Sequence, residues 1–232
     1  MRGIRRSAWK LLIVAALFGG CAWLYHQGRQ ASLRTPQYLP AIILDAGHGG
    51  EDGGAVSPGG IKESDINLSI TLKLDQMLGL LGETPILLRE EDLSLHDDTA
   101  VTIREKKVSD LKNRTAATNA LPTATLVSIH QNSYPDPKYK GTQVFYAPTG
   151  GSEQLAKAIQ QCVSLQIQPN NTRQPKPVPD SVYLMNHIAN RAVLVECGFL
   201  TNPEEETLLQ QTEYQCKLAL VLAVTLSNQF PQ

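Results

Sequence analysis

Two kinds of hydrophobic pattern alternate along the chain from residue 41 onward. Short apolar runs, bounded by glycine, proline or polar residues, have the length of buried β-strands. Between them lie longer stretches in which apolar residues recur at the spacing of one helix face. The short runs predict strands at residues 41–45, 84–89, 124–130, 141–147 and 191–199.

The first predicted strand is followed by an amphipathic pattern. Apolar residues at helical spacing predict a helix over residues 64–81, with Ser64 and Asp65 as N-terminal caps. Glu63 therefore lies at the entrance of this helix. Further helical segments are expected at 151–166, after Pro203, and at 212–230.

Two stretches predict irregular structure. Residues 90–112 are polar and acidic, which favours a loop followed by a helical turn. Residues 168–180 are rich in proline, which is incompatible with regular helix or central strand. They predict a long surface loop that either lines a ligand groove or only crosses the surface.

Strands that alternate with helices are typical of an α/β fold. We expect a single domain over residues 41–232, built on a mostly parallel mixed sheet of about six strands with helices on both faces. The polar residues 27–40, which include two prolines, predict a linker ahead of that domain.

Residues 1–26 resemble a targeting segment. Basic residues precede an apolar run from Leu11 to Tyr25, which is shorter than the ~20 residues of a membrane-spanning helix. This pattern fits a signal sequence or an N-terminal membrane anchor, and Cys21 leaves lipidation open. Because basic residues favour the cytoplasmic side, the domain is expected on the extracytoplasmic side of the membrane.

Composition narrows the function classes. A chain that is 42% hydrophobic and 19% charged is folded and globular. Its formal net charge of -1 gives no electrostatic reason to bind nucleic acid. Beyond Cys21, the cysteines at 162, 197 and 216 lack the CxxC spacing of a metal site and predict no disulfide framework.

Four chemically capable residues are predicted to meet at one edge of the sheet. In an open α/β sheet, ligands bind outside the carboxyl ends of the strands. His48 follows the first strand, while His130 and Glu196 end two others, and Glu63 enters the helix after the first turn. Two imidazoles and one carboxylate are a ligand set for catalytic zinc, and a further carboxylate, for which we choose Glu196, serves as the base.

The spacing of these residues is not diagnostic by itself, because no HExxH motif is present and strand-end histidines are often structural. The glycine-rich stretch IILDAGHGGEDGG at 42–54 also raises the alternative of a phosphate-binding loop. It lacks the GxGxxG spacing, and its histidine and acids suit a metal better than a pyrophosphate. Its glycines permit positive φ and close approach of a ligand.

Six ordered motifs extend the evidence beyond single residues. They are LDAGHGGEDGG, KESDINL, LLRE, NRTAATN, VSIHQN and VLVECGFLTNPEE. In these motifs the chain resembles the zinc-dependent N-acetylmuramoyl-L-alanine amidases that cleave bacterial peptidoglycan, over about residues 41–230. Gly53 and Thr118 depart from the family pattern, but neither is a proposed ligand.

The resemblance implies that His48, Glu63 and His130 bind one zinc ion and that Glu196 is the catalytic carboxylate. It further implies hydrolysis of the amide between N-acetylmuramic acid and the L-alanine of the stem peptide. Two alternatives remain: a zinc peptidase acting on the stem peptide, and a non-catalytic wall-binding or regulatory module.

The layout of the chain is most similar to germination-specific amidases of spore-forming bacteria. It has a short N-terminal segment, one catalytic domain and no wall-binding repeats. This resemblance implies a role in spore cortex maturation through muramic-δ-lactam formation, or else in wall remodelling. It also implies a downstream deacetylase and a lipoprotein activator as partners.

Three further residues are candidates for supporting roles. Asp45 can orient a ligand histidine through the ring nitrogen that faces away from the metal. Asn132 and Arg173 can contact substrate. For Arg173, as for Arg89 and Arg114, a structural salt bridge is the alternative to a carboxylate of the wall peptide.

Overall fold

The computed structural model describes residues 41–229. The predicted anchor at 1–26 and linker at 27–40 lie outside these residues. Within the described part of the chain, no helix is both long enough and apolar enough to cross a membrane.

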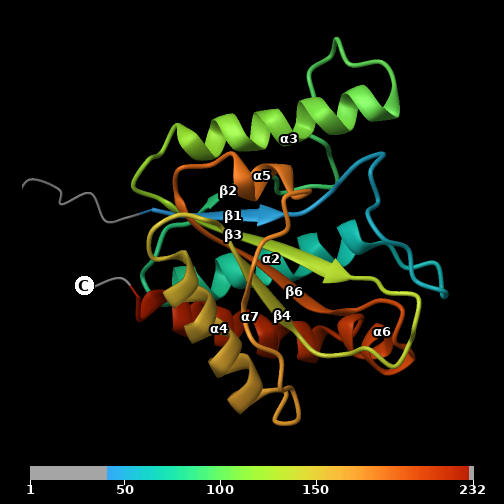
Figure 1. The fold of residues 1–232 in the computed structure, drawn as a ribbon, viewed down its shortest axis with the longest axis vertical. Coiled ribbons are helices and arrows are strands. Elements are labelled where there is room, and N and C mark those ends of the chain that lie inside the picture. The colour runs from blue at the N-terminus through green and yellow to red at the C-terminus, as the bar shows by residue number, and fades with distance from the viewer. Residues whose placement is uncertain (1–40, 230–232) are drawn as a thin grey trace, which may run out of the picture. The chain divides into compact units, whose positions relative to one another are not determined.

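One six-stranded mixed sheet forms the centre of the structure, with strand order β2-β1-β3-β6-β4-β5 (Figure 1). Strands β2, β1, β3 and β6 run parallel to one another, and β4 pairs antiparallel with β6. The strands are β1 (Ile42–Ala46), β2 (Ile86–Leu87), β3 (Thr125–Asn132), β4 (Gln143–Tyr146), β5 (Lys176–Pro177) and β6 (Arg191–Phe199). The predicted fold class is therefore confirmed.

Helices cover both faces of the sheet (Figure 1). They are α2 (Glu63–Leu80), α3 (Ile103–Asn119), α4 (Ser152–Gln166), α5 (Tyr183–Asn186), α6 (Pro203–Leu209) and α7 (Thr212–Ser227). Apolar residues of α2, α4 and α7 pack on one face against alternate strand residues such as Leu44, Val127 and Val195. The opposite face packs Ile43, Leu126 and Leu194 against α5 and one side of α3.

Helix α3 differs most from the sequence prediction. A loop with a helical turn was expected over residues 90–112, but α3 runs from Ile103 to Asn119. Thr102 and Glu105 form a capping box at its start. The buried residues of α3 are polar, so the helix has no apolar stripe that a periodicity argument can detect; they are Asp110, Arg114, Thr115 and Thr118.

Two smaller differences concern ends and loops. Helix α2 begins one residue earlier than expected, with Lys62 at the N-cap position and no side-chain cap, so Ser64 and Asp65 lie inside the helix. The proline-rich segment 168–180 includes the short edge strand β5, where proline is tolerated because an edge strand leaves one side unpaired.

A buried arginine joins α3 to the end of β1. The guanidinium of Arg114 forms ion pairs with Asp45 and Asp110, and it donates to the carbonyl oxygens of Ala46 and His48 at 3.0 and 2.8 Å. Burial favours the neutral carboxyl of Asp45, but Arg114 and the Ser128 hydroxyl outweigh it and keep the pKa of Asp45 below its ordinary value. Polar contacts thus hold this helix where apolar contacts do not.

Replacing Arg114 by methionine should destabilise the protein strongly. The change leaves two carboxylates without their cation, and removing one partner of a buried pair costs about 3–5 kcal/mol. The free energy of unfolding in urea measures the effect. The matched control is Lys157→Met, which removes an exposed ion pair with Glu153 and should cost under about 1 kcal/mol. Equal losses in the two variants would contradict a structural role for Arg114.

Candidate metal and catalytic site

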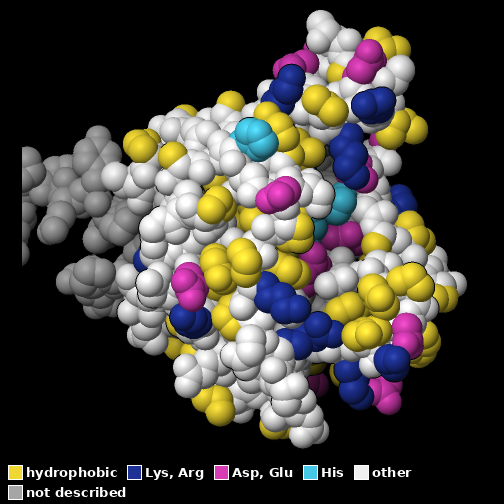
Figure 2. Space-filling view, viewed as in Figure 1, with side chains coloured by type: hydrophobic (Ala, Val, Ile, Leu, Met, Phe, Trp, Pro, Cys, Tyr) yellow, Lys and Arg dark blue, Asp and Glu magenta, His cyan; other side chains and the backbone are white. Residues whose placement is uncertain are grey.

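His130 and Glu196 point to the face of the sheet that α3 and α5 cover, because successive side chains along a strand alternate between the two faces. Residues two apart along a strand share a face, so Glu196 lies on the side of Leu194, and His130 on the side of Ser128. His130 and Glu196 are direct partners in the pairing of β3 with β6. Histidine and acidic side chains meet in a hollow of this face (Figure 2).

His48 lies in the turn after β1 with a φ of 62°, a left-handed conformation that is uncommon outside glycine. The surrounding glycines make room for the ligand side chains. A Cβ on Gly47 would lie 2.2 Å from Nε2 of His130, and a Cβ on Gly54 would lie 2.6 Å from Oε2 of Glu63. Side chains at these positions would expel the neighbours that the site requires.

The glycines Gly49 and Gly50 have a packing role in the turn. A Cβ on Gly49 would lie 2.3 Å from the carbonyl oxygen of Leu93, and one on Gly50 would lie 3.1 Å from the amide nitrogen of Ser94. Both also have positive φ. They therefore let the turn pack against the segment that follows β2.

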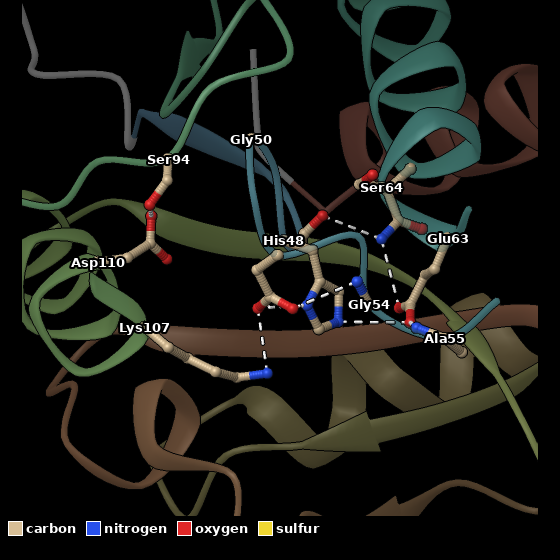
Figure 3. Close-up of polar contacts among 12 residues, drawn as sticks. His48, Gly50, Gly54, Ala55, Glu63, Ser64, Ser94, Lys107 and Asp110 are labelled. Atoms are coloured by element: carbon tan, nitrogen blue, oxygen red, sulfur yellow. Dashed lines mark hydrogen bonds and ion pairs between the residues drawn. The ribbon is translucent and has the colours of Figure 1, made fainter. Parts of the chain in front are cut away.

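Glu63 joins the two histidines. Its Oε1 lies 2.8 Å from Nδ1 of His130, and its Oε2 lies 3.3 Å from Nε2 of His48. One ligand atom from each of the three residues lies within 4.8 Å of the others, a separation suited to one shared metal ion. Figure 3 shows the side chains of His48 and Glu63 pointing toward one another. The backbone N–H groups of Ala55 and Gln131 donate to Glu63 as well, at 2.9 and 3.1 Å.

The charges of these groups favour a cation between them. Burial opposes ionisation of Glu63, but hydrogen bonds from both histidines outweigh it and keep the pKa of its carboxyl well below the ordinary value. Burial likewise opposes a charge on His48, but the carboxylates of Asp52 and Glu63 raise its pKa to about 9.

Glu196 borders the same space without joining the three ligands. Its Oε2 is buried and has no hydrogen-bond partner among the described residues. Burial is the main cause that raises the pKa of this carboxyl to about 7. An unpartnered carboxylate that titrates near neutral pH can take up and release a proton during a reaction.

A cavity of about 170 Å³ is lined by His48, His130 and Glu196. Leu184 and Met185 of α5 line it as well. The sequence prediction missed the contribution of α5. Its only signal was the short apolar group that follows the proline-rich segment, which is too short to show helical periodicity.

The structure gives Asp45 a different partner from the predicted one. Its carboxylate pairs with Arg114 and accepts from the Ser128 hydroxyl at 2.6 Å, rather than contacting a ligand histidine. The Nδ1 atom of His48 instead lies 2.9 Å from Oδ2 of Asp52. Asp45 therefore acts on the site indirectly, through Arg114 and through Ser128 on the strand that carries His130.

The arginine and asparagine candidates are distributed over separate places. Arg89 is buried and donates to the carbonyl oxygens of Ala46, Gly47 and Ser64, which is a structural role. Asn132 ends β3, just beyond His130. Arg173 stacks its guanidinium 4.7 Å from the centre of the Phe199 ring and lines a separate groove of about 640 Å³ near α6.

Comparison with known proteins agrees with this geometry. The family model for N-acetylmuramoyl-L-alanine amidases matches residues 42–228. A germination-specific N-acetylmuramoyl-L-alanine amidase of Bacillus subtilis is 36% identical over 179 residues, which cover 77% of this chain and 74% of that protein.

Solved structures show the same relationship. The CwlD amidase of Clostridioides difficile, solved in complex with the GerS lipoprotein, is 39% identical with a TM-score of 0.78, and the match covers 82% of this chain and 97% of that one. An N-acetylmuramoyl-L-alanine amidase from Clostridium difficile 630 is 28% identical with a TM-score of 0.67, covering 81% and 94%. The chain therefore belongs to the N-acetylmuramoyl-L-alanine amidase family.

Proposed function

We propose that the protein is a zinc-dependent amidase that hydrolyses the bond between N-acetylmuramic acid and L-alanine in peptidoglycan. The observation that carries this proposal is the group of His48, Glu63 and His130 beside the unpartnered carboxylate of Glu196. Two neutral imidazoles and one carboxylate suit zinc and leave a coordination position open for substrate or water. When bound, zinc would supply a Lewis acid that polarises the substrate carbonyl.

In the proposed reaction, Glu196 moves the proton. Its carboxylate accepts a proton from the attacking water while the water oxygen bonds to the lactyl carbonyl carbon. The carbon–nitrogen bond then breaks, and the carboxyl of Glu196 gives the proton to the amine of L-alanine. A pKa near neutral suits a group that must act first as base and then as acid.

Asn132 and Arg173 are proposed to contact the substrate beyond the reacting bond. The position of Asn132 at the end of β3 supports its role, because it follows His130 on the same strand. The groove beside Arg173 supports a contact with a carboxylate of the stem peptide, since a guanidinium can pair with a carboxylate through two parallel hydrogen bonds.

We further propose a role in spore cortex maturation, through muramic-δ-lactam formation, on the extracytoplasmic side of the membrane. The similarity to a germination-specific amidase supports this role. The similarity to an amidase solved with a lipoprotein supports a lipoprotein activator for this chain too. A deacetylase that acts on the exposed muramic acid would be the next enzyme in the sequence.

Digestion of purified peptidoglycan discriminates the amidase from a peptidase acting on the stem peptide. The amidase should release stem peptides with a free L-alanine amine and leave muramic acid without peptide. Mass spectrometry and amine labelling identify both products. Shortened stem peptides that remain attached to muramic acid would instead establish the peptidase.

Replacing Glu196 by glutamine should abolish most turnover while zinc stays bound. The amide cannot accept the proton of water, and general acid–base catalysis contributes about 10²–10⁴-fold to rates. Release of L-alanine amines measures activity, and elemental analysis measures zinc. Glu213→Gln, a change at an exposed glutamate on α7 that lies outside the groove beside Arg173, is the control and should keep full activity. An unchanged rate in Glu196→Gln would refute its role as the base, whereas absence of turnover in the unmodified protein would favour a module without catalysis.

Zinc binding should depend on pH through His48. Because the pKa of His48 is raised to about 9 in the metal-free protein, the ring carries a proton at neutral pH that zinc must displace. Affinity should therefore rise with pH, about ten-fold per unit below pH ~9, and level off above it. Calorimetry in buffers of different ionisation enthalpy should detect release of about one proton.

A chelator should remove the activity, and added zinc should restore it.

A further inference from the structure

His48 is held through both nitrogens of its ring. Nε2 faces Glu63 at 3.3 Å (Figure 3). Nδ1 lies 2.9 Å from Oδ2 of Asp52. A ring nitrogen that donates to a carboxylate leaves the other nitrogen free to bind a metal. The contact with Asp52 therefore selects Nε2 as the metal-facing atom.

The carboxylate of Asp52 is itself fixed by other groups. Lys107 of α3 places Nζ 3.0 Å from the same Oδ2, and the backbone N–H of Gly54 donates to Oδ1 at 3.3 Å. Both Asp52 and Lys107 remain partly exposed to solvent. Lys107 thus connects the first turn of the site to a helix far away in sequence (Figure 3).

The backbone of the turn adds a second restraint on His48. Gly49 and Asp52 exchange two backbone hydrogen bonds, of 2.9 and 3.2 Å, and these close the turn that presents the histidine. The left-handed conformation of His48 is costly for a residue with a side chain, and such conformations persist only where the surroundings impose them. Asp52 restrains His48 through both backbone and side chain.

We propose that Asp52 is the positioning residue for the metal ligand His48, and that Lys107 acts through Asp52 by holding its carboxylate. The proposal rests on the proposed function, in which His48 binds zinc. It assigns to Asp52 the orienting role that a carboxylate plays behind many ligand histidines. It also makes α3 part of the metal site, although the three ligands lie on other elements.

The neighbouring residue on α3 offers a matched control. Lys106 pairs with Glu51 at 2.6 Å and makes no contact with Asp52. Lys106→Met and Lys107→Met remove the same charge from adjacent positions of the same helix. Only Lys107→Met removes the ion pair with Asp52, the residue that contacts His48.

The test is the zinc affinity of the full chain, measured by competition with a chromogenic chelator. Asp52→Ala should weaken zinc binding about 10–100-fold, the range found when an orienting partner is lost. Asp52→Asn keeps an acceptor for Nδ1 and should recover part of this loss. Lys107→Met should weaken binding by about two- to five-fold, as expected for a half-exposed ion pair, and Lys106→Met should change nothing.

The double variant distinguishes positioning from a general effect on folding. If Lys107 acts through Asp52, then Lys107→Met should have no further effect in the Asp52→Ala background. Circular dichroism and thermal unfolding of the metal-free variants should show that all of them fold.

Several results would overturn the inference: wild-type affinity in Asp52→Ala, equal losses in Lys106→Met and Lys107→Met, or additive losses in the double variant. Failure of the unmodified protein to bind zinc would overturn the proposed function itself, and the two failures are therefore distinguishable.

Discussion

The guanidinium of Arg114 is the interaction on which the arrangement of the site depends. It forms an ion pair with Asp45 at the end of β1 and donates hydrogen bonds to the carbonyl oxygens of Ala46 and His48. A single buried cation thereby fixes both the exit of the first strand and the position of α3. Because α3 buries few apolar atoms, this polar contact replaces the hydrophobic packing that normally attaches a helix to a sheet.

Electrostatic interactions also position Glu63. It is the first residue of α2, where the partial positive charge of the helix N-terminus favours a carboxylate. The same carboxylate lies between two histidines and is supported by backbone N–H groups from two separate segments. The described residues thus hold a carboxylate in place between the two histidines, as the proposed metal site requires.

The sequence predicted the parts of the structure that follow from hydrophobic periodicity. His48, Glu63 and His130 were placed correctly at one sheet edge, because strand ends and a helix entrance can be located from apolar patterns. The period of two along β6 likewise puts Glu196 on the face where it borders the cavity.

Hydrophobic periodicity does not predict contacts that depend on the path of a loop. Asp45 and Asp52 flank the same histidine in sequence, and only the path of the turn decides that Asp52 contacts the ring. Helix α3 escaped detection because its buried side chains are polar, and α5 because it is too short to show a period.

The packing of His130 against Gly47 has a consequence for how this protein can vary. The imidazole occupies the space that any larger residue at position 47 would need. A substitution there would displace His130, a proposed metal ligand, while leaving every proposed ligand residue in the sequence intact. Among natural variants, a chain that lost Gly47 would therefore keep all the hallmarks of an active enzyme on inspection, yet behave as though His130 itself had been deleted.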